Sequence, residues 1–366
     1  MRTRLLNLGA IKCGVLCVSA ALLAGAGARA SDSSSLASLF GQKDETSKDW
    51  WQHIHLGLPI TMNVKADFKV NGTFALPVGQ TGATGTNGVN HVYDDGYVKV
   101  DNTGDALGYT SYWGYQNANQ YDPLTGLLTM HSATSYTANG SESKTGQPFI
   151  GVEAGYGMDL WNPNPFHVGW EFNAGLTPIR ITDNASFAST VNQSIFTFNT
   201  GGIIMPTAPY NGGPSGIGPT IQDVATAAAP ATDANSVVSG TRKLDVMLYT
   251  FRLGPTVSWD INDRFRLMGG AGGALGLVSG HYEFDETIST SSGSSARNSG
   301  KIWMSKAVYG GYVDATLLYH VIDHGDVYAG ARFMPLSGAT VSGMGREAKL
   351  DLGGALQFSV GVNWPF

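Results

Sequence analysis

The side chains best suited to chemistry in this chain are its eight histidines and a group of serines close to one of them. His281 precedes a serine-rich stretch at residues 289–295, and a histidine base beside a serine nucleophile is an arrangement that hydrolyses esters and amides. No nucleophile motif accompanies any of the histidines, and a stretch rich in serine is ordinarily a solvated loop. We therefore predict that the protein is not an enzyme and has no catalytic residue, with a lipid hydrolase as the last of three alternatives.

Two short stretches could hold a metal ion through oxygen atoms, namely Asp94-Asp95-Gly96 and residues 101–105. Calcium is bound by such clusters, but the helix-flanked loop of the best-known calcium site is absent, so ordinary turn formation explains them better. The glycines between Gly269 and Gly276 are not followed by the Gly-Lys-Ser/Thr sequence of a phosphate-binding loop. We expect no metal and no cofactor.

A strict alternation of polarity indicates the elements that position these residues. From Ile54 to Val70 every even position is apolar, whereas the odd positions include His55, Lys65 and Lys69. A period of two is typical of β-strands, and this run is longer than most strands of soluble sheets. Glycine is abundant (49 residues), only 14% of the residues are charged, and no later stretch is apolar enough for a membrane helix. Together these features favour strands that cross a membrane.

The same pattern predicts six more strands, at residues 149–161, 166–177, 244–259, 264–282, 302–321 and 327–336, and a last one that runs to the C-terminus. Three pairs are joined by tight turns rich in Asn, Asp, Pro and Gly, whereas the other connections are long, with the longest at 71–148 and 178–243. Short and long connections alternate, which predicts an all-β fold: an antiparallel up-and-down transmembrane β-barrel with short periplasmic turns and long extracellular loops. Eight strands is the favoured count, and ten to twelve follow if hairpins within the two longest loops also cross the membrane.

Residues 1–30 have the features of a secretory signal peptide, with a basic start, an apolar run and Ala28-Arg29-Ala30 before a cleavage site. Cys13 and Cys17 lie in this segment, so we predict a mature chain without thiol or disulfide chemistry. Removal of the segment takes away four basic residues and no acidic one, which shifts the formal net charge from −6 to −10 and argues against a nucleic-acid partner. Residues 31–53 are predicted to be a periplasmic N-terminal lead-in, and residues 54–366 to form the barrel.

The C-terminus repeats the alternation. Its apolar positions are Phe358, Val360, Val362, Trp364 and the final Phe366. Here the sequence resembles the outer-membrane β-barrel proteins of Gram-negative bacteria, whose last strand ends on an aromatic residue. The resemblance implies that these five residues are the assembly signal read by the barrel-assembly machinery. It also implies a place in the bacterial cell outer membrane, in contact with lipid and lipopolysaccharide.

The alternation assigns charged residues to the interior of the barrel. The predicted lumen charge network consists of Lys65, Glu153, Glu171, Arg252, Arg266, Asp314 and Arg332, with Asp67 and Asp351 on the same face. Opposite charges inside a narrow barrel are expected to form hydrogen-bonded ion pairs, because an unpaired buried charge is costly. The arrangement resembles the interior of the OmpA-like and opacity-protein eight-stranded barrels, which implies a plugged lumen.

Large aromatic residues fall at the predicted periplasmic strand ends: Trp51, Trp161, Trp259, Tyr319 and Trp364. Amphipathic rings favour the level of the lipid headgroups, so we predict that these residues form a periplasmic aromatic girdle. The first long loop is rich in Tyr and Trp, which either bind an extracellular protein or glycan ligand or pack a β-extension above the membrane. The predicted function is a structural or surface-interaction role through the long loops, and the alternative is a porin or a small-solute or ion channel.

Overall fold

The computed structural model describes residues 52–76, 88–104, 106–291, 295–322 and 325–365. The predicted signal peptide and most of the lead-in lie outside these residues, although Gln52 and His53 already belong to the first strand. Among the described residues, no helix is long and apolar enough to cross a bilayer. Residues 50–366 form one compact unit, and its regular structure is nearly all β-strand.

The main sheet contains fifteen strands rather than the eight predicted, because bends divide several antiparallel runs and because β7, β8 and β12 lie in segments predicted to be loops. Its strands are β1 (Gln52–Met62), β2 (Lys65–Ala75), β7 (Tyr121–Asp122), β8 (Leu127–Thr145), β9 (Phe149–Ile150), β10 (Val152–Trp161), β11 (Phe166–Asp183), β12 (Phe187–Asn199), β15 (Ala227–Asn262), β16 (Phe265–Ser289), β17 (Ser295–Ile322), β18 (Gly325–Phe333), β19 (Leu336–Gly343), β20 (Arg346–Leu352) and β21 (Leu356–Pro365).

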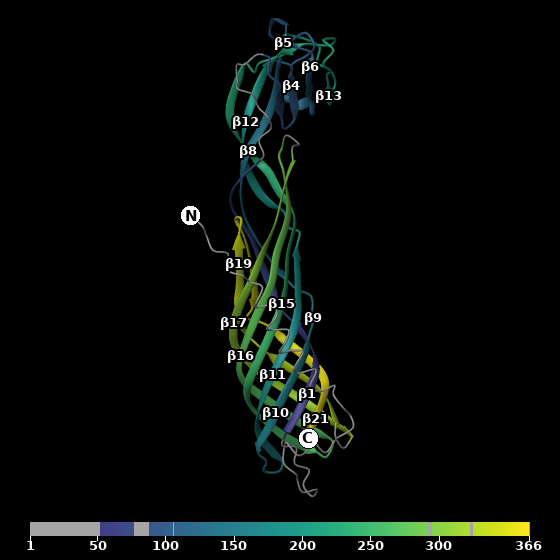
Figure 1. Cartoon of the computed structure of the whole chain (residues 1–366), viewed down its shortest axis with the longest axis vertical. Coiled ribbons are helices and arrows are strands. Elements are labelled where there is room, and N and C mark those ends of the chain that lie inside the picture. Colours follow the sequence, from purple (N-terminus) through teal and green to yellow (C-terminus); the bar gives the residue numbers. More distant parts are fainter. Residues whose placement is uncertain (1–51, 77–87, 105, 292–294, 323–324, 366) are drawn as a thin grey trace, which may run out of the picture. The chain divides into compact units, whose positions relative to one another are not determined.

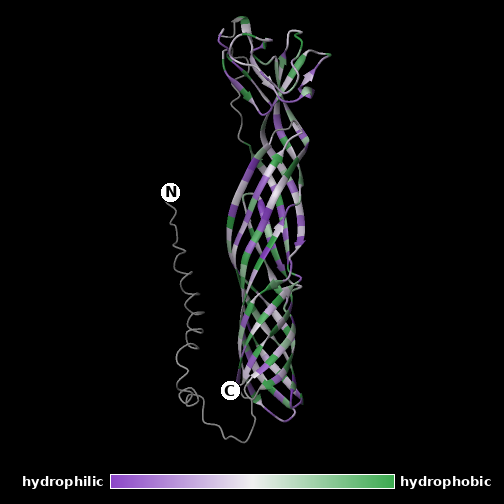
Figure 2. Ribbon diagram, turned by 90° about the vertical axis from the view of Figure 1, so that its right-hand side faces the viewer, coloured by the Kyte–Doolittle hydropathy of each residue, from purple (hydrophilic) through white to green (hydrophobic). Residues whose placement is uncertain are grey.

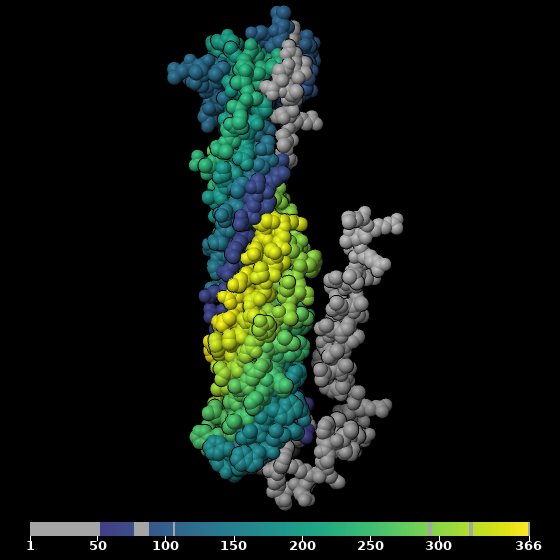
Figure 3. Space-filling view, turned by 90° about the vertical axis from the view of Figure 1, so that its left-hand side faces the viewer, coloured from purple at the N-terminus to yellow at the C-terminus, as the bar shows by residue number. Residues whose placement is uncertain are grey.

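The pairings close this sheet on itself twice. One closed path, the lower ring, runs through β1, β10, β11, β15, β16, β17, β18 and β21 and back to β1. A second path, the upper ring, runs through β2, β8, β12, β15, β16, β17, β19 and β20 and back to β2 (Figure 1). In Figure 3 the last strands, in yellow, lie beside the first, in purple, where β20 pairs with β2. The predicted antiparallel, all-β barrel is confirmed. The lower ring is closed by continuous pairing, whereas β17 and β19 of the upper ring share the single pair Gly310 and Leu336.

Small sheets form a cap beyond the tips of β8 and β12 (Figure 1). One contains β3 (His91–Tyr93), β4 (Gly96–Lys99), β6 (Tyr112–Tyr115) and β13 (Tyr210–Asn211), and the other pairs β5 (Tyr109–Thr110) with β14 (Ile221–Gln222). Two short 3-10 helices, η1 (Ala106–Gly108) and η2 (Ala118–Gln120), lie between the strands. Tyr93, Trp113 and Tyr115 are buried in the cap core with Leu128 of β8 and Phe198 of β12. These aromatic residues of the predicted first loop therefore pack a β-extension rather than face solvent.

The polarity of the wall reverses between the two rings. In β1 the outward residues are apolar, such as Leu56 and Leu58, and the inward residues include His53 and His55. In β2 the inward residues are apolar, and Lys65 and Lys69 face solvent. Figure 2 shows hydrophobic and hydrophilic residues interleaved along the strands of both regions, so only the facing distinguishes them.

The inward apolar side chains of the upper ring form a hydrophobic core. It includes Val64, Ala66 and Phe68 of β2 and its preceding bend, with Leu244, Val246 and Leu248 of β15 and Leu350 and Leu352 of β20. The upper ring is thus packed like a soluble protein, with apolar side chains inside and polar side chains outside. The lower ring has the opposite distribution, which is the one expected of a barrel surrounded by lipid.

In β1 and β2 the reversal follows from a bend between the two strands, whereas in β15 the same face stays inward and its residues change from apolar (Leu244, Leu248) to polar (Thr250, Arg252). Asn63 adopts a left-handed conformation (φ 59°), which asparagine tolerates better than most residues. Met62 and Asn63 are both exposed and Val64 is fully buried, so the side chains change faces at this point. The paired strand makes a matching change at Gly353 and Gly354, and the side-chain amide of Asn63 donates a hydrogen bond to the Gly354 carbonyl (2.9 Å). From β1 to β2 the apolar and polar residues alternate in the sequence without interruption. The apolar residues nevertheless point outward in β1 and inward in β2.

Candidate functional site

The inward face of the lower ring carries a buried cluster of charged residues. Glu153 of β10 accepts two hydrogen bonds from Arg332 of β18, at 2.8 and 3.1 Å. Arg252 of β15 lies with its guanidinium 2.8 Å from the second Glu153 carboxylate oxygen. Asp314 of β17 contacts both guanidiniums, at 3.4 Å from Arg252 and 3.3 Å from Arg332. Glu153, Arg252, Asp314 and Arg332 thus come together from four strands, as the sequence predicted for the lumen charge network.

The sheet register explains this meeting. Asp314 is the direct partner of Arg332 across β17 and β18, so their side chains leave the wall side by side. Gln357 of β21 accepts a further hydrogen bond from Arg332 (3.0 Å) and donates one to Thr61 of β1 (3.0 Å). The charged cluster is therefore tied to the pair of strands that closes the ring.

Glu171 of β11 lies in the lumen but is not paired with either arginine among the described residues. Its contacts are with Asn173, which donates a hydrogen bond to it, and with His53 and His55, whose Nε2 atoms lie 3.7 and 3.9 Å from its carboxylate oxygens. The sequence analysis placed these histidines near the periplasmic end without giving them a role. Their spacing of two residues on a strand, with both on the inward face, was the available signal.

Arg266 of β16 belongs to a separate group near the lower end of the barrel. It binds Asp260 (2.6 Å) and lies 3.9 Å from Asp159, and His167 lies 2.8 Å from Asp260. The prediction that Arg266 joins the network of Glu153 is therefore wrong, because Arg266 stands close to the turn between β15 and β16 and finds its partner there.

The prediction for Lys65 is also wrong. Lys65 is exposed on β2 and Asp351 of β20 is its partner across the sheet, outside the barrel. Asp67 of β2 likewise lies on the outward face. The bend at Asn63 and the matching glycines at 353 and 354 turn these charged residues outward, where water solvates them.

The upper ring holds a second buried network that the sequence analysis missed. Arg242 donates to Glu286 (2.6 Å) and Asp183 (3.1 Å), and Arg346 donates to the other Glu286 oxygen (2.6 Å) and to the Tyr136 hydroxyl (2.9 Å). The four charged side chains of this network are fully buried. Two arginines balance two carboxylates, so this network is electrically matched. The lower cluster has three carboxylates, those of Glu153, Glu171 and Asp314, and two arginines.

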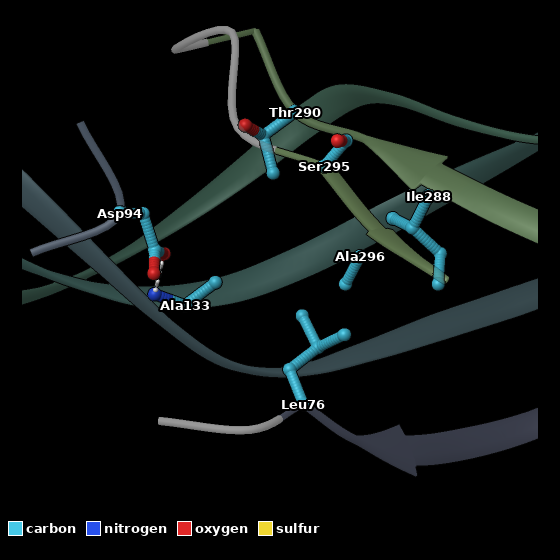
Figure 4. Close-up of a pocket in the computed structure, with 7 residues that line it drawn as sticks. All are labelled: Leu76, Asp94, Ala133, Ile288, Thr290, Ser295 and Ala296. Atoms are coloured by element: carbon cyan, nitrogen blue, oxygen red, sulfur yellow. Dashed lines mark hydrogen bonds between the residues drawn. The ribbon is translucent and has the colours of Figure 1, made fainter. Parts of the chain in front are cut away.

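One cavity lies in the lower lumen and another lies near the cap. A cavity of about 20 Å³ lies beside His55, Glu153, Glu171 and Tyr328, which is room for a single water molecule. A larger opening of about 130 Å³ lies near the cap, lined by Leu76, Ile288, Thr290 and Ala296 (Figure 4). Asp94 is the charged residue among those that line this opening. Its carboxylate already accepts a hydrogen bond from the Ala133 amide (2.6 Å).

The acidic residues that could have bound calcium instead stabilise the cap. Asp95 accepts hydrogen bonds from the His131 amide (2.8 Å) and pairs with the His131 ring (2.6 Å), which raises the pKa of His131. Burial favours the neutral form of Asp101, but hydrogen bonds from the amides and hydroxyls of Ser111 and Thr103 outweigh it and hold the pKa of Asp101 well below its usual range. Both clusters are ordered turns.

The predicted girdle residues within the described chain lie near the ends of their strands. Trp161, Trp259 and Trp364 are exposed and Tyr319 is half-buried, and Trp51 lies outside the described residues. Phe166 stacks on Trp259 and Phe265 packs against Tyr319, with ring centroids 6.4 and 5.0 Å apart. Of the predicted assembly signal, Phe358, Val360, Val362 and Trp364 point outward, and Phe366 lies outside the described residues.

No family model and no curated protein matches this chain. Solved structures that it resembles include the outer membrane protease OmpT of Escherichia coli, at 10% identity and a TM-score of 0.31, covering 86% of this chain and 97% of that one. Another is Ail, the attachment invasion locus protein of Yersinia pestis, at 9% identity and a TM-score of 0.24, covering 86% and 99%. A FadL homologue of Pseudomonas aeruginosa follows at 8% identity and a TM-score of 0.17, covering 86% and 90%. At this level the likenesses assign no family and carry no function over to this chain.

Proposed function

We propose that this chain is an integral outer-membrane protein of a bacterium, with a structural or surface-interaction role. In this proposal the eight strand segments of the lower ring cross the bilayer. The upper ring and the cap stand outside the membrane as a rigid, closed stalk. The charged cluster around Glu153 fills the lumen and fixes the register of the strands.

The reversal of polarity between the rings is the observation that carries the proposal. Every strand of the lower ring exposes large apolar side chains, and these include Ile54, Leu56, Leu58, Val152, Leu160, Phe172, Phe251, Leu253, Val257, Leu267, Leu275, Val313, Leu317, Val327, Phe333, Phe358, Val360 and Val362. A continuous apolar belt around a barrel is costly in water and is stabilising in lipid. Above the belt, outward charges such as Lys69 and Arg180 mark where the lipid would end.

The length of the lower strands supports the same conclusion. β1 has 11 residues, and β10 and β21 have 10 each. A tilted strand needs about 9–11 residues to cross the hydrocarbon core of a bilayer. The bend at Asn63 and the glycines at 353 and 354 therefore fall where the membrane surface would lie.

The cap is the part suited to contact an extracellular protein or glycan. Leu107, Leu124, Ile204 and Ile217 are each at least 85% exposed there, although large apolar side chains are normally covered. They stand on turns held by the buried cap core, so the apolar groups are presented on a fixed support.

The channel alternative predicts a measurable current, and we expect none. The purified protein inserted into a planar bilayer is expected to leave the current at baseline, because the charged side chains of the lower lumen pair with one another and the cavity beside them is about 20 Å³. Heat-denatured protein is the control for leakage. Large, stable conductance steps would show that the protein is a channel and not a plugged barrel.

A further inference from the structure

We propose that His53, His55 and Glu171 form a binding site for a divalent transition-metal ion of the zinc type, held inside the lower ring. Imidazole nitrogens with a carboxylate oxygen are a common ligand set for such ions. The ligand atoms of the three residues all lie within 4.8 Å of one another. The inference stands on the lumen alone and does not depend on the proposed membrane location.

The strand register builds this site across three strands. His53 and His55 face inward from β1, opposite Gly157 and Gly155 of β10. Gly157 is in turn the partner of Glu171 on β11. Because Gly155 and Gly157 have no side chains, both imidazole rings extend across β10 toward Glu171. A Cβ atom at Gly155 would lie 2.1 Å from the His55 ring, and one at Gly157 would lie 2.3 Å from His53 Nε2.

Two of the three ligand atoms, the His53 Nε2 and one Glu171 carboxylate oxygen, are buried without a hydrogen bond among the described residues. His53 is 9% exposed and Glu171 5%, and the His55 Nε2 lies 3.7 Å from Glu153 and 3.9 Å from Glu171. The distances of 3.7 and 3.9 Å from the imidazoles to Glu171 are too long for hydrogen bonds. Ligands of a tetrahedral zinc ion lie about 3.3 Å apart, so a small inward movement of the rings would complete the site.

The charge of the cluster favours a cation at this point. Arg252 and Arg332 are engaged by Glu153 and Asp314, which leaves Glu171 as the carboxylate without a guanidinium. An uncompensated carboxylate in a buried site is costly, and a bound divalent ion would compensate it. The small cavity lined by His55, Glu153 and Glu171 has room for a water molecule as the fourth ligand.

The surroundings would orient the ligands. Asn173 donates a hydrogen bond to Glu171, and Tyr328 packs edge-on against the His55 ring with centroids 5.7 Å apart. Second-layer contacts of this kind fix the ligands of metal sites. A bound ion would fasten β1 to β11 across β10, at the place where the first and last strands of the lower ring meet.

Calorimetric titration of the purified, folded protein with Zn²⁺ tests the site directly, using protein without a polyhistidine tag. We expect one saturable site per chain. His53→Ala, His55→Ala and Glu171→Gln are each expected to weaken binding at least tenfold. The matched control is His131→Ala, which removes a histidine that also pairs with a carboxylate but lies in the cap, and its affinity is expected to stay within twofold of the original.

A second measurement on the unaltered chain guards against variants that fail to fold. Co²⁺ substitutes for Zn²⁺ and absorbs visible light in a way that reports imidazole and carboxylate ligation. A saturable Co²⁺ spectrum that Zn²⁺ displaces would support the site. Absence of saturable binding by the unaltered protein, or full affinity in both folded histidine variants, would overturn it.

Discussion

Replacing Glu153 with alanine is expected to cost about 3–5 kcal/mol of stability, because it leaves two buried guanidiniums without their shared partner. The side chains of Arg252 and Arg332 are 1% and 6% exposed, so water cannot take the place of the carboxylate. Asp314 contacts both arginines only at 3.3–3.4 Å and carries a single charge. Urea unfolding of the protein folded into lipid vesicles measures the difference.

The control for this prediction is Glu142→Ala. Glu142 pairs with Lys144 at 3.0 Å, but both side chains are 39% exposed, and such pairs contribute about 0–1 kcal/mol. A double variant, Glu153→Ala with Arg332→Met, is expected to recover part of the loss because it removes one of the stranded charges. Equal stability of Glu153→Ala and Glu142→Ala would show that the lower cluster does not hold the barrel together.

Replacing Leu253 with arginine is expected to cost about 2–4 kcal/mol in a lipid vesicle, since Leu253 lies midway along the outward face of β15 in the lower ring. A charge at that depth must leave water for hydrocarbon. The outward Ser299 of β17, in the upper ring opposite Asp285, is the matched control. Ser299→Arg is expected to change stability by no more than about 0.5 kcal/mol.

The comparison of these two variants has a clear failing outcome. If Leu253→Arg folds into vesicles as stably as Ser299→Arg, the outward face of the lower ring does not contact lipid. The proposed membrane location would then be wrong, whereas the metal site, which depends only on the lumen, would be untouched.

Much of the barrel could be predicted from the alternation of polarity. The segment predicted at 166–177 is the lower part of β11, the segment at 244–259 lies within β15, and the segment at 264–282 lies within β16 except for its first residue. These three observed strands are longer than predicted. From Leu244 to Thr256 the even residues of β15 face inward, and they change from apolar at Leu244, Val246 and Leu248 to polar at Thr250, Arg252 and Thr256, so the phase of the alternation shifts within the strand. The predicted loops 71–148 and 178–243 contain β8 and β12.

The exchange of faces between β1 and β2 could not be read from the sequence. The pattern from Ile54 to Val70 is continuous, and a period of two says which residues share a face but not which face is inside. A single left-handed residue, Asn63, decides it. This is why Lys65, which follows the bend, lies outside the barrel, whereas Glu153, Arg252, Asp314 and Arg332 lie in the lumen of the lower ring.

The two sites that the sequence analysis missed depend on contacts between distant strands. Arg242 and Glu286 stand in or beside segments predicted to be loops, so their burial was not expected. His53 and Glu171 are separated by more than a hundred residues and meet only because Gly157 leaves room between them. Such contacts follow from register, which the sequence pattern does not determine.

The most direct measurement of the central claim uses spin labels attached to single cysteines. The chain without residues 1–30 has no cysteine of its own, so each label reports one position. We expect labels at positions 253 and 360, in the lower ring, to be reached by lipid-soluble oxygen and shielded from a water-soluble nickel complex. Labels at 182, near the upper end of β11, and at 299, in the upper ring, are expected to show the reverse. Equal access of the nickel complex to all four positions would contradict a membrane boundary at Asn63.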